Sequence, residues 1–206
     1  MKQKIIHIDP DNVDADGLSV AAAVAAAGDL TLGGALTSGG VFTADYARQI
    51  SITSSGNDSG RTFTVTGTDA NGLTQTEAVT GPNAGTVEST KYFKTITSIS
   101  ADAACAGNIS VGTVDEFVTG VVPLDFQNGN VKTVSIEDIS GTIEVAVEQT
   151  FSNVFDRSNI NYFAAHADIT DITAAAHAEL DNNATGVRLV CNSYTNTAEL
   201  RMVVIG

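Results

Sequence analysis

The feature that most constrains the fold is an alternating segment closed by an Asn-Gly pair. In RTFTVTGT, Phe63 and Val65 fall on one face of an extended chain and the threonines on the other. After Asn71-Gly72 the alternation resumes in LTQTEAVTG. An Asn-Gly pair between two such segments is the strongest short-range signal of a hairpin, because both residues accept the positive φ that the tight turn needs. The sequence therefore predicts an antiparallel β-hairpin here.

Similar β-rich segments occupy most of the chain. We predict further strands in RQISITS, KYFKTITSIS, NISVGTV, VKTVSI, GTIEVAVEQT, GVRLVCNSY and AELRMVVIG. The spacing of Ile96 and Ile99 breaks strict alternation and predicts a β-bulge between them. Ile143, Val145 and Val147 are expected to face the core. The last two segments, joined by TNT, fit a terminal hairpin.

Two stretches have some helical character. FAAHADITDITAAAHAEL, residues 163–180, has helical potential but no clean apolar stripe. The Ala-rich run at residues 20–27 is too short for a stable isolated helix and is followed by Gly28, so we read it as extended or irregular.

These patterns predict an all-β fold, an antiparallel β-sandwich of the Ig-like or jelly-roll-like kind. With 206 residues the chain has room for one or two domains. The connector VTGVVPLDF, residues 118–126, contains Pro123 and suggests a boundary. We expect an extended N-terminal arm at 1–27, a β-sandwich domain at 28–117 and a second β domain at 118–206.

The charge balance argues against several classes of partner. The formal net charge is −14 and the isoelectric point is about 4.3, with ten Lys and Arg scattered singly. Nucleic-acid binding requires a basic stripe, and an acidic surface repels anionic lipid as well. We therefore expect no nucleic-acid partner and no membrane partner. The apolar start of the chain is interrupted by His7, Asp9 and Pro10, so we expect no secretory leader.

The sequence Asp58-Ser59-Gly60 resembles the nucleophile turn of chymotrypsin-type serine proteases. That motif has further glycines, but Asn57 and Arg61 stand at those positions here. A catalytic serine also needs a histidine base oriented by a third group. The one histidine that precedes Ser59 is His7, and no recognised catalytic motif surrounds it. The residues of this stretch are those that complete turns. We expect no catalytic residue and no enzyme.

Two groups of polar residues could hold a cation. Asn12, Asp14, Asp16 and Gly17 match the opening of an EF-hand-like loop, but Ala23 stands where its bidentate glutamate belongs. The sequence leaves open whether the loop, with Asp9 and Asp11, binds a cation weakly. The second group matches no known metal signature; it comprises His166, Asp168, Asp171, His177 and Glu179. We expect no metal site and no cofactor.

The cysteines and aromatic residues are few. Cys105 and Cys191 are expected to be buried free thiols, and the sequence leaves open whether they form a disulfide. The chain has no Trp, and aromatic residues make up 6% of it. We expect most of a set of five in the core, namely Tyr46, Tyr92, Phe93, Tyr162 and Tyr194.

One resemblance extends over residues 28–114. GDLTLGGALTSGGVFT, RQISITSSGNDSGRTFTVTGTDANG, TEAVTGPNAGTVESTKYFKTITSIS and AGNISVGT resemble, in this order, a recurrent module of virion structural proteins of tailed bacteriophages. The second half, ending ATGVRLVCNSYTNTAELRMVVIG, is similar to the closing β-region of such proteins, with a weaker motif.

The resemblance implies a non-enzymatic structural component of a tailed-phage virion, assembled in the bacterial host cytoplasm. It implies foremost a capsid decoration (cement) protein, expected as a homotrimer that binds the major capsid protein and stabilises the shell. A tail, adaptor or fibre and baseplate component is the alternative. A host-surface glycan-binding module is a further one. The N-terminal arm is expected to contact a neighbouring subunit.

Overall fold

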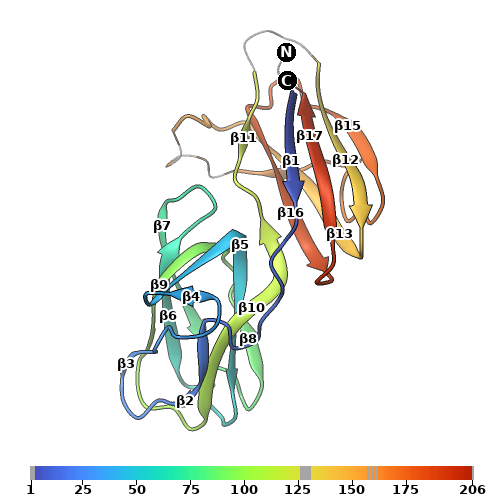
Figure 1. The fold of residues 1–206 in the computed structure, drawn as a ribbon. Helices are drawn as coiled ribbons and strands as arrows, with labels where there is room; N and C mark the ends of the chain where they lie inside the picture. Colours follow the sequence, from blue (N-terminus) through green and yellow to red (C-terminus); the bar gives the residue numbers. More distant parts are fainter. Residues whose placement is uncertain (1–2, 126–130, 157, 159, 161, 206) are drawn as a thin grey trace. The chain divides into compact units, whose positions relative to one another are not determined.

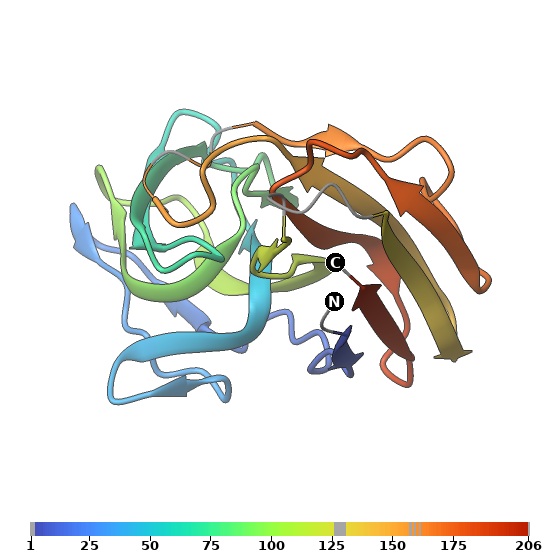
Figure 2. The same ribbon diagram turned by 90° about the horizontal axis from the view of Figure 1, so that it is seen from above.

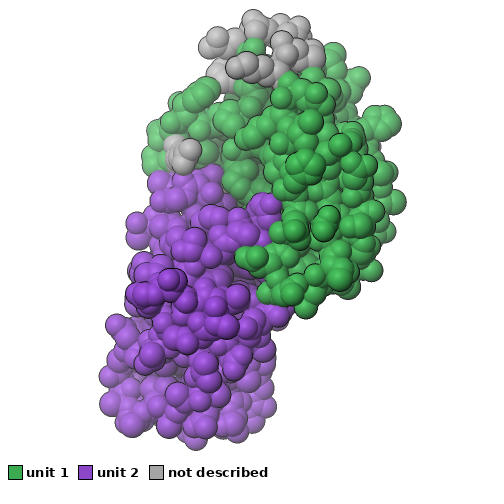
Figure 3. Space-filling view, viewed as in Figure 1, with its two compact units in different colours: residues 1–12, 115–206 green, residues 13–114 purple. Residues whose placement is uncertain are grey.

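The computed structural model describes residues 3–125, 131–156, 158, 160 and 162–205. The fold is all-β, with antiparallel sheets in a sandwich-like arrangement, as the sequence predicted. The chain forms two compact units, coloured separately in Figure 3. Unit 1 comprises residues 1–12 and 115–206, and unit 2 comprises residues 13–114. Unit 2 is therefore inserted into the sequence of unit 1.

Unit 2 is built around one sheet with the strand order β10-β5-β9-β6-β7, and four short strands pair onto it. β2 pairs with β10, β3 with β9, and both β4 and β8 with β5 (Figure 1). The strands are β2 (Ser19–Ala23), β3 (Gly28–Asp29), β4 (Thr37–Ser38), β5 (Val41–Ser54), β6 (Thr62–Thr68), β7 (Thr74–Thr80), β8 (Thr86–Glu88), β9 (Phe93–Ala101) and β10 (Asn108–Val118). β10 continues into unit 1 after Val114.

The Asn-Gly hairpin predicted from the alternating segment is the β6–β7 pair. Phe63 lies opposite Val79, and both are buried. The threonines that alternate with Phe63 and Val65 along β6 lie on the other face of the sheet. The Asp69 side chain accepts backbone hydrogen bonds from Asn71 and Leu73, which fixes the turn. Gly72 has a φ of 84°. The hairpin is therefore confirmed, but its turn is longer than the expected tight one: it spans residues 69–73, and Gly72 has positive φ whereas Asn71 does not.

The predicted bulge in β9 is present. β6 pairs Thr66 with Ser98 and then Gly67 with Ile96, so Thr97 is the extra residue. Because of the bulge, Ile96 and Ile99 both reach the core although three positions separate them. The core of unit 2 is aliphatic and aromatic; its buried members are Leu18, Leu32, Phe42, Ala44, Ile50, Ile52, Phe63, Val65, Val79, Phe93, Ile96, Ile99, Ala101, Ile109 and Val111.

Unit 1 contains two sheets. One has the order β1-β17-β12-β15; in the other, β13 lies between β14 and β16, and β16 also pairs with β11 and the end of β10. The strands are β1 (Gln3–Ile8), β11 (Val122–Pro123), β12 (Lys132–Ser140), β13 (Ile143–Thr150), β14 (Ala164–Ala165), β15 (Ala176–Leu180), β16 (Gly186–Tyr194) and β17 (Glu199–Ile205). Ile143, Val145 and Val147 are buried, as predicted.

The expected terminal hairpin is wrong. β16 and β17 both exist, but β16 pairs with β13 while β17 pairs with β12 and β1, so the TNT turn carries the chain from one sheet to the other. The turn between β12 and β13 does the same. The two turns bind each other, because Thr195 N donates to Thr142 O at 2.8 Å and Thr142 N donates to Thr195 Oγ1 at 3.2 Å.

The N-terminal residues are not a loose arm. Residues 3–8 form β1, which pairs antiparallel with β17 from Gln3–Ile205 to Ile8–Leu200. Figures 1 and 2 show the first strand, blue, beside the last, red. The arm was inferred from a poor core pattern, and β1 has such a pattern because it is an edge strand in which only Ile8 is buried.

The unit boundaries also differ from the expected ones. Residues 13–27 belong to unit 2, where Leu18 is fully buried and β2 pairs with β10. The change from unit 2 to unit 1 falls at residue 114, close to the expected 117. The stretch at 163–180 contains β14 and β15 and no helix, since its apolar residues serve two short strands.

Candidate functional site

The Asp58-Ser59-Gly60 turn is organised around the carboxylate of Asp58. This side chain is 1% exposed and accepts three hydrogen bonds. They come from Ser54 Oγ at 2.5 Å, from Ala106 N at 2.6 Å and from Gly107 N at 3.2 Å. The carboxylate thus joins the end of β5 to the turn before β10.

Burial raises the pKa of Asp58, but the hydrogen bonds from Ser54, Ala106 and Gly107 together with the Arg61 charge outweigh it and hold the pKa below its ordinary 3.8. Ser59 is exposed, and its hydroxyl donates to Asn57 Oδ1 at 2.8 Å. An amide oxygen is no general base. The geometry of this turn is that of a structural connection.

The acidic loop that resembles an EF-hand opening uses its first carboxylate to bind its own backbone. Asp14 Oδ1 accepts a hydrogen bond from Asp16 N at 3.2 Å, and Asp14 N donates to Thr113 Oγ1 at 3.1 Å. Asp9 and Asp11 belong to unit 1, whereas Asp14 and Asp16 belong to unit 2. Within residues 3–125, 131–156, 158, 160 and 162–205, no three His, Cys, Asp or Glu side chains gather in a metal-binding arrangement.

His166 is a buried structural residue with both ring nitrogens in use. Nε2 lies 2.8 Å from the backbone oxygen of Glu179, and Nδ1 accepts from Asp168 N at 3.3 Å. The ring is therefore the Nε2–H tautomer in this arrangement. His166 follows β14 and Glu179 lies in β15, so this contact joins the two sheets of unit 1.

The other four members of that polar group are dispersed. Asp168 contacts the His166 ring through its backbone N–H, and Glu179 contacts it through its backbone oxygen. Asp171 accepts a hydrogen bond from Asn192 Nδ2 at 2.6 Å. His177 is exposed on β15. Their side chains do not converge on one point.

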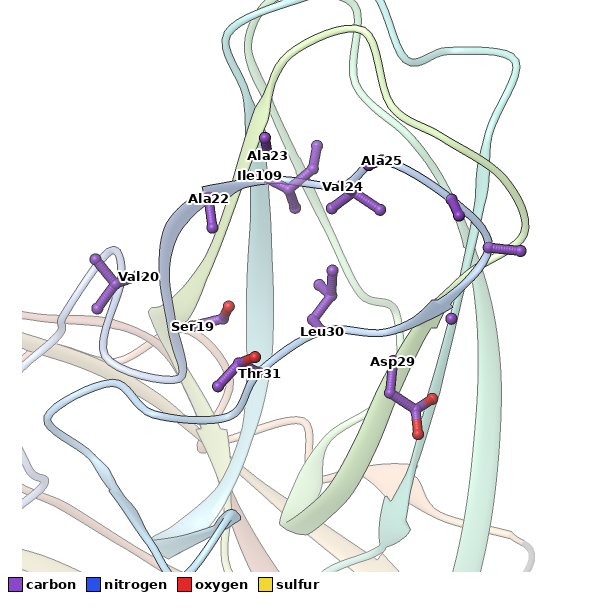
Figure 4. Close-up of a pocket in the computed structure, with 13 residues that line it drawn as sticks. Ser19, Val20, Ala22, Ala23, Val24, Ala25, Asp29, Leu30, Thr31 and Ile109 are labelled. Atoms are coloured by element: carbon purple, nitrogen blue, oxygen red, sulfur yellow. The ribbon is translucent and has the colours of Figure 1, made fainter.

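A hollow of about 240 Å³ lies in unit 2, inside the loop formed by residues 19–31 (Figure 4). Its lining is almost free of charge and consists of the Ala-rich run, Leu30 and Ile109, with Ser19, Asp29 and Thr31 as the polar side chains. Small-molecule sites usually enclose about 300–1,000 Å³ and present several convergent polar groups. The hollow falls short in both respects.

The clearest outward feature of unit 1 is a set of exposed aromatic side chains after β13. Phe151 is 42% exposed, Phe155 is 74% exposed and Tyr162 is 60% exposed. All three lie in the segment that follows β13 and precedes β14, two strands that pair with Gln149 opposite Ala164. We call residues 151, 155 and 162 the aromatic surface.

The backbone that carries the aromatic surface is anchored at its start. Val154 is buried and packs where Gly186 has no side chain: a Cβ there would lie 2.7 Å from Val154 Cγ1. Thr185 Oγ1 donates to Ser152 O at 2.5 Å, and Phe155 N donates to Asn153 Oδ1 at 3.1 Å. Phe151 and Phe155 are therefore held out into solvent by a fixed segment.

The segment is also anchored at its other end. The Arg188 guanidinium lies 3.6 Å from the ring centroid of Phe163 and pairs with Glu148 at 2.6 Å. A cation over an aromatic face is stabilising by about 0.5–2 kcal/mol. Phe163, next to Tyr162 in the chain, is thus fixed to β16.

The expectation for the five aromatic residues holds for two of them. Phe93 and Tyr194 are buried, and the Tyr194 ring packs edge-on against Phe117 with centroids 5.8 Å apart. Tyr46 and Tyr92 are half-buried, and Tyr162 is exposed. The exposed Phe151 and Phe155 were not among the five. Their position in a segment rich in Ser and Asn, outside any alternating pattern, was the available signal.

Both cysteines are free thiols, and the expected burial holds for Cys191 but not for Cys105. Cys191 is fully buried in β16 and Cys105 is half-buried. Burial, followed by the negative charge of Asp58, raises the pKa of the Cys105 thiol. The raised pKa leaves little of the reactive thiolate at neutral pH.

Comparisons of the chain with protein-family models, with curated proteins and with solved structures give no match. The part of the chain that the structure describes contains no helix of the length and apolarity needed to cross a membrane.

Proposed function

We propose that this protein is a non-enzymatic structural component of a tailed-phage virion, a capsid decoration protein that binds the major capsid protein and stabilises the shell. The observation that carries the proposal is the aromatic surface of unit 1, with Phe155 74% exposed on an anchored segment. The resemblance of residues 28–114 to virion modules supplies the biological setting.

The aromatic surface has the physical properties of a protein-binding element. Burying one Phe side chain contributes about 1.5–3 kcal/mol. Binding sites concentrate their energy in a few aromatic residues that fill pockets of the partner. Because Val154, Thr185 and Gly186 fix the segment, little conformational entropy is lost when a partner covers it. Such rings act as the anchor residues of a binding site, and the surrounding interface supplies the rest of the buried area.

The charge supports a position outside the packaged genome. A net charge of −14 repels DNA and favours an outer face of the particle in contact with solvent. A decoration protein would act by bridging shell subunits through buried surface, without chemistry. We expect it to work as a closed homo-oligomer, with a homotrimer as the expected form.

The location is tested by cryo-electron microscopy of the virion whose genome encodes the chain. Density for the two units at the local three-fold positions of the capsid supports the proposal. Density confined to the vertex, the tail or the baseplate would replace it with the adaptor or fibre role, and absence from the particle would end both.

The contact is tested by binding of the purified protein to undecorated shells. Phe155→Ser should weaken binding by about tenfold or more, since a central aromatic residue carries at least 1.4 kcal/mol. Val20→Ser is the matched control, because Val20 is also a large apolar residue, 56% exposed, but lies in unit 2. Equal binding by both variants and the unaltered protein would remove the aromatic surface from the proposal.

The same aromatic surface favours one second function, a glycan-binding module used at the host surface. Exposed Phe155 and Tyr162 rings could stack on sugar rings. The low aromatic content of the chain, 6%, gives this alternative less support. A glycan array separates the two: retention of a defined glycan that Tyr162→Ala abolishes would establish it, and a blank array would remove it.

A further inference from the structure

Strand β1 is an edge strand of its sheet. Among the described strands it pairs with β17 alone and forms one edge of its sheet. Only Ile8, 1% exposed, is buried, while Ile5 is 49% exposed. A strand with one neighbour and one buried side chain is among the elements that separate most easily from a fold.

β17, in contrast, requires a strand at this position. Its residues Leu200, Met202 and Val204 are all buried, at 3%, 0% and 2% exposure. They lie opposite Ile8, Ile6 and Lys4 of β1. Without β1 the strand ELRMVVI would be an open, apolar edge, which proteins avoid because it pairs with other chains. The edge of β17 must be covered, but nothing requires that its own chain supply the cover.

The charge of β1 makes it attractive to any copy of the protein. Residues 1–8 contain Lys2 and Lys4 and no acidic residue, so they carry +2. Taking this from the total of −14 leaves −16 on residues 9–206. Two bodies of this charge repel each other, whereas a short basic strand from one body is drawn to the other.

The covalent connection permits the exchange. The chain runs from β1 through Asp9–Asn12 directly into unit 2, and it returns to unit 1 only after residue 114. β1 therefore meets β17 across almost the whole sequence, from Ile8 to Leu200. Because residues 13–114 fold as a unit of their own, the hinge available to β1 is the segment of residues 9–12 that joins it to unit 2.

We propose that β1 is exchanged between copies of this protein, so that each β17 is covered by the β1 of another copy in a closed homo-oligomer. The pairing is the one seen here, with Ile5 opposite Val203, but between chains. Strand exchange needs no new complementary surface, which two strongly acidic faces could hardly provide. The proposal is independent of where in a particle the protein works.

The test uses two chains that each carry one new cysteine. In a Cys105→Ser, Cys191→Ala background, an Ile5→Cys chain and a Val203→Cys chain with different tags are produced together in one cell. Directly opposed residues of antiparallel strands have Cβ atoms about 4.5–5.5 Å apart, close enough for a disulfide after small shifts. A disulfide that joins the two different chains is the expected result, because it requires the β1 of one on the β17 of the other.

The matched control replaces Ile5→Cys by Gln3→Cys. Gln3 lies opposite Ile205, two positions from Val203, or about 6.5 Å along the strand. Its yield of joined chains should be lower by about tenfold, since the longer separation exceeds disulfide reach. Equal yields in both mixtures would indicate random oxidation and overturn the proposal.

A single chain with both Ile5→Cys and Val203→Cys tests the alternative, in which β1 stays paired with the β17 of its own chain. If it closes into a disulfide within one chain and the mixed chains do not join, β1 stays on its own body and the proposal is wrong. The unaltered protein provides a check that needs no substitution, because light scattering should give a multiple of 21.2 kDa. A mass of 21.2 kDa for the full chain at all concentrations would also overturn it.

Discussion

The carboxylate of Asp58 accepts a 2.6 Å hydrogen bond from the backbone N–H of Ala106, 48 positions further along the chain. The same carboxylate binds Ser54 and Gly107. One buried acidic residue thus holds together the end of β5, the turn before β6 and the turn before β10. In the sequence, Asp58 stands next to Ser59, the residue that resembles a nucleophile. In the structure, the Asp58 carboxylate makes the hydrogen bonds that hold this turn in place.

We expect Asp58→Ala to destabilise unit 2 by about 2–4 kcal/mol, because it leaves the buried N–H groups of Ala106 and Gly107 and the Ser54 hydroxyl without an acceptor. Asp58→Asn should cost less, since the amide oxygen still accepts. Urea unfolding followed by circular dichroism measures both. Ser59→Ala is the control, because Ser59 is exposed and binds only Asn57; an equal loss in Ser59→Ala would contradict the assignment.

Asp58 also predicts a pH dependence. Its folded-state pKa lies below the ordinary 3.8, so its contribution to stability is fully present above about pH 5 and is lost as the pH falls through 3.8 toward the folded-state pKa. The free energy of unfolding should therefore fall more steeply between pH 5 and 3 in the unaltered protein than in Asp58→Asn. Parallel curves for the two proteins would show that Asp58 contributes nothing to acid sensitivity.

Gly67 is predicted to tolerate no side chain. A Cβ at this position would overlap the backbone oxygen of Thr95 beside the β9 bulge. Because backbone atoms cannot rotate away, we expect Gly67→Ala to cost about 3 kcal/mol or more. At Gly60, in the same unit, a Cβ would meet nothing within 4 Å, so Gly60→Ala should stay within about 0.5 kcal/mol of the unaltered protein. Similar melting temperatures for the two variants would argue against the bulge geometry.

His166 is predicted to act as a structural link rather than a metal ligand. His166→Ala removes the contact with Glu179 O and leaves the Asp168 N–H without its acceptor, at a cost of about 1–3 kcal/mol. His177→Ala, two positions before Glu179 on the exposed face of β15, should be nearly neutral. Zn²⁺ should not raise the melting temperature of the unaltered protein, because both ring nitrogens of His166 are engaged. A rise that His166→Ala abolishes would restore the metal interpretation.

Arg48 is predicted to be irreplaceable by Lys. It is 1% exposed, and its guanidinium binds both carboxylate oxygens of Asp45: Nε donates to Oδ1 and Nη2 donates to Oδ2, each at 3.1 Å. A lysine ammonium cannot form this two-point contact, so Arg48→Lys should cost about 2–3 kcal/mol. Arg201, whose side chain is 34% exposed beside Glu137 and Asp138, is the control. Arg201→Lys should have a much smaller effect on the urea midpoint, because solvent screens exposed ion pairs.

The local structure was readable from the sequence wherever side chains alternate between core and solvent. Phe63 and Val65 marked β6, Asn71-Gly72 marked its turn, and the three-residue spacing of Ile96 and Ile99 marked the bulge at Thr97. These signals are local, since each depends on neighbours within a few positions. Such signals also established the fold class.

Pairing between distant strands was not readable. The turn between Tyr194 and Glu199 looks like a hairpin turn, but a hairpin and a crossing between sheets have the same short polar loop. The choice depends on which strand already occupies each edge. β1 was missed for a related reason: its exposed lysine and histidine are compatible with an edge strand and also with an unpaired arm.

The candidate site was the least predictable part. Phe151 and Phe155 are exposed, and their position outside an alternating pattern does not by itself distinguish an exposed aromatic residue from one that packs in a core. Ser59, Asp14 and His166 were conspicuous in sequence because of their chemistry, yet their hydrogen bonds are directed to nearby backbone and amide groups.

The insertion of unit 2 into unit 1 has a consequence for synthesis on the ribosome. Unit 2 is continuous in sequence and can complete its core once residue 114 has left the exit tunnel. Unit 1 cannot, because β1 emerges early and β17 comes last among its strands. At about 5–20 residues per second, the interval between the two strands lasts on the order of ten seconds or more. During that interval β1 is an exposed basic strand on a nascent chain, beside other chains growing on the same messenger RNA.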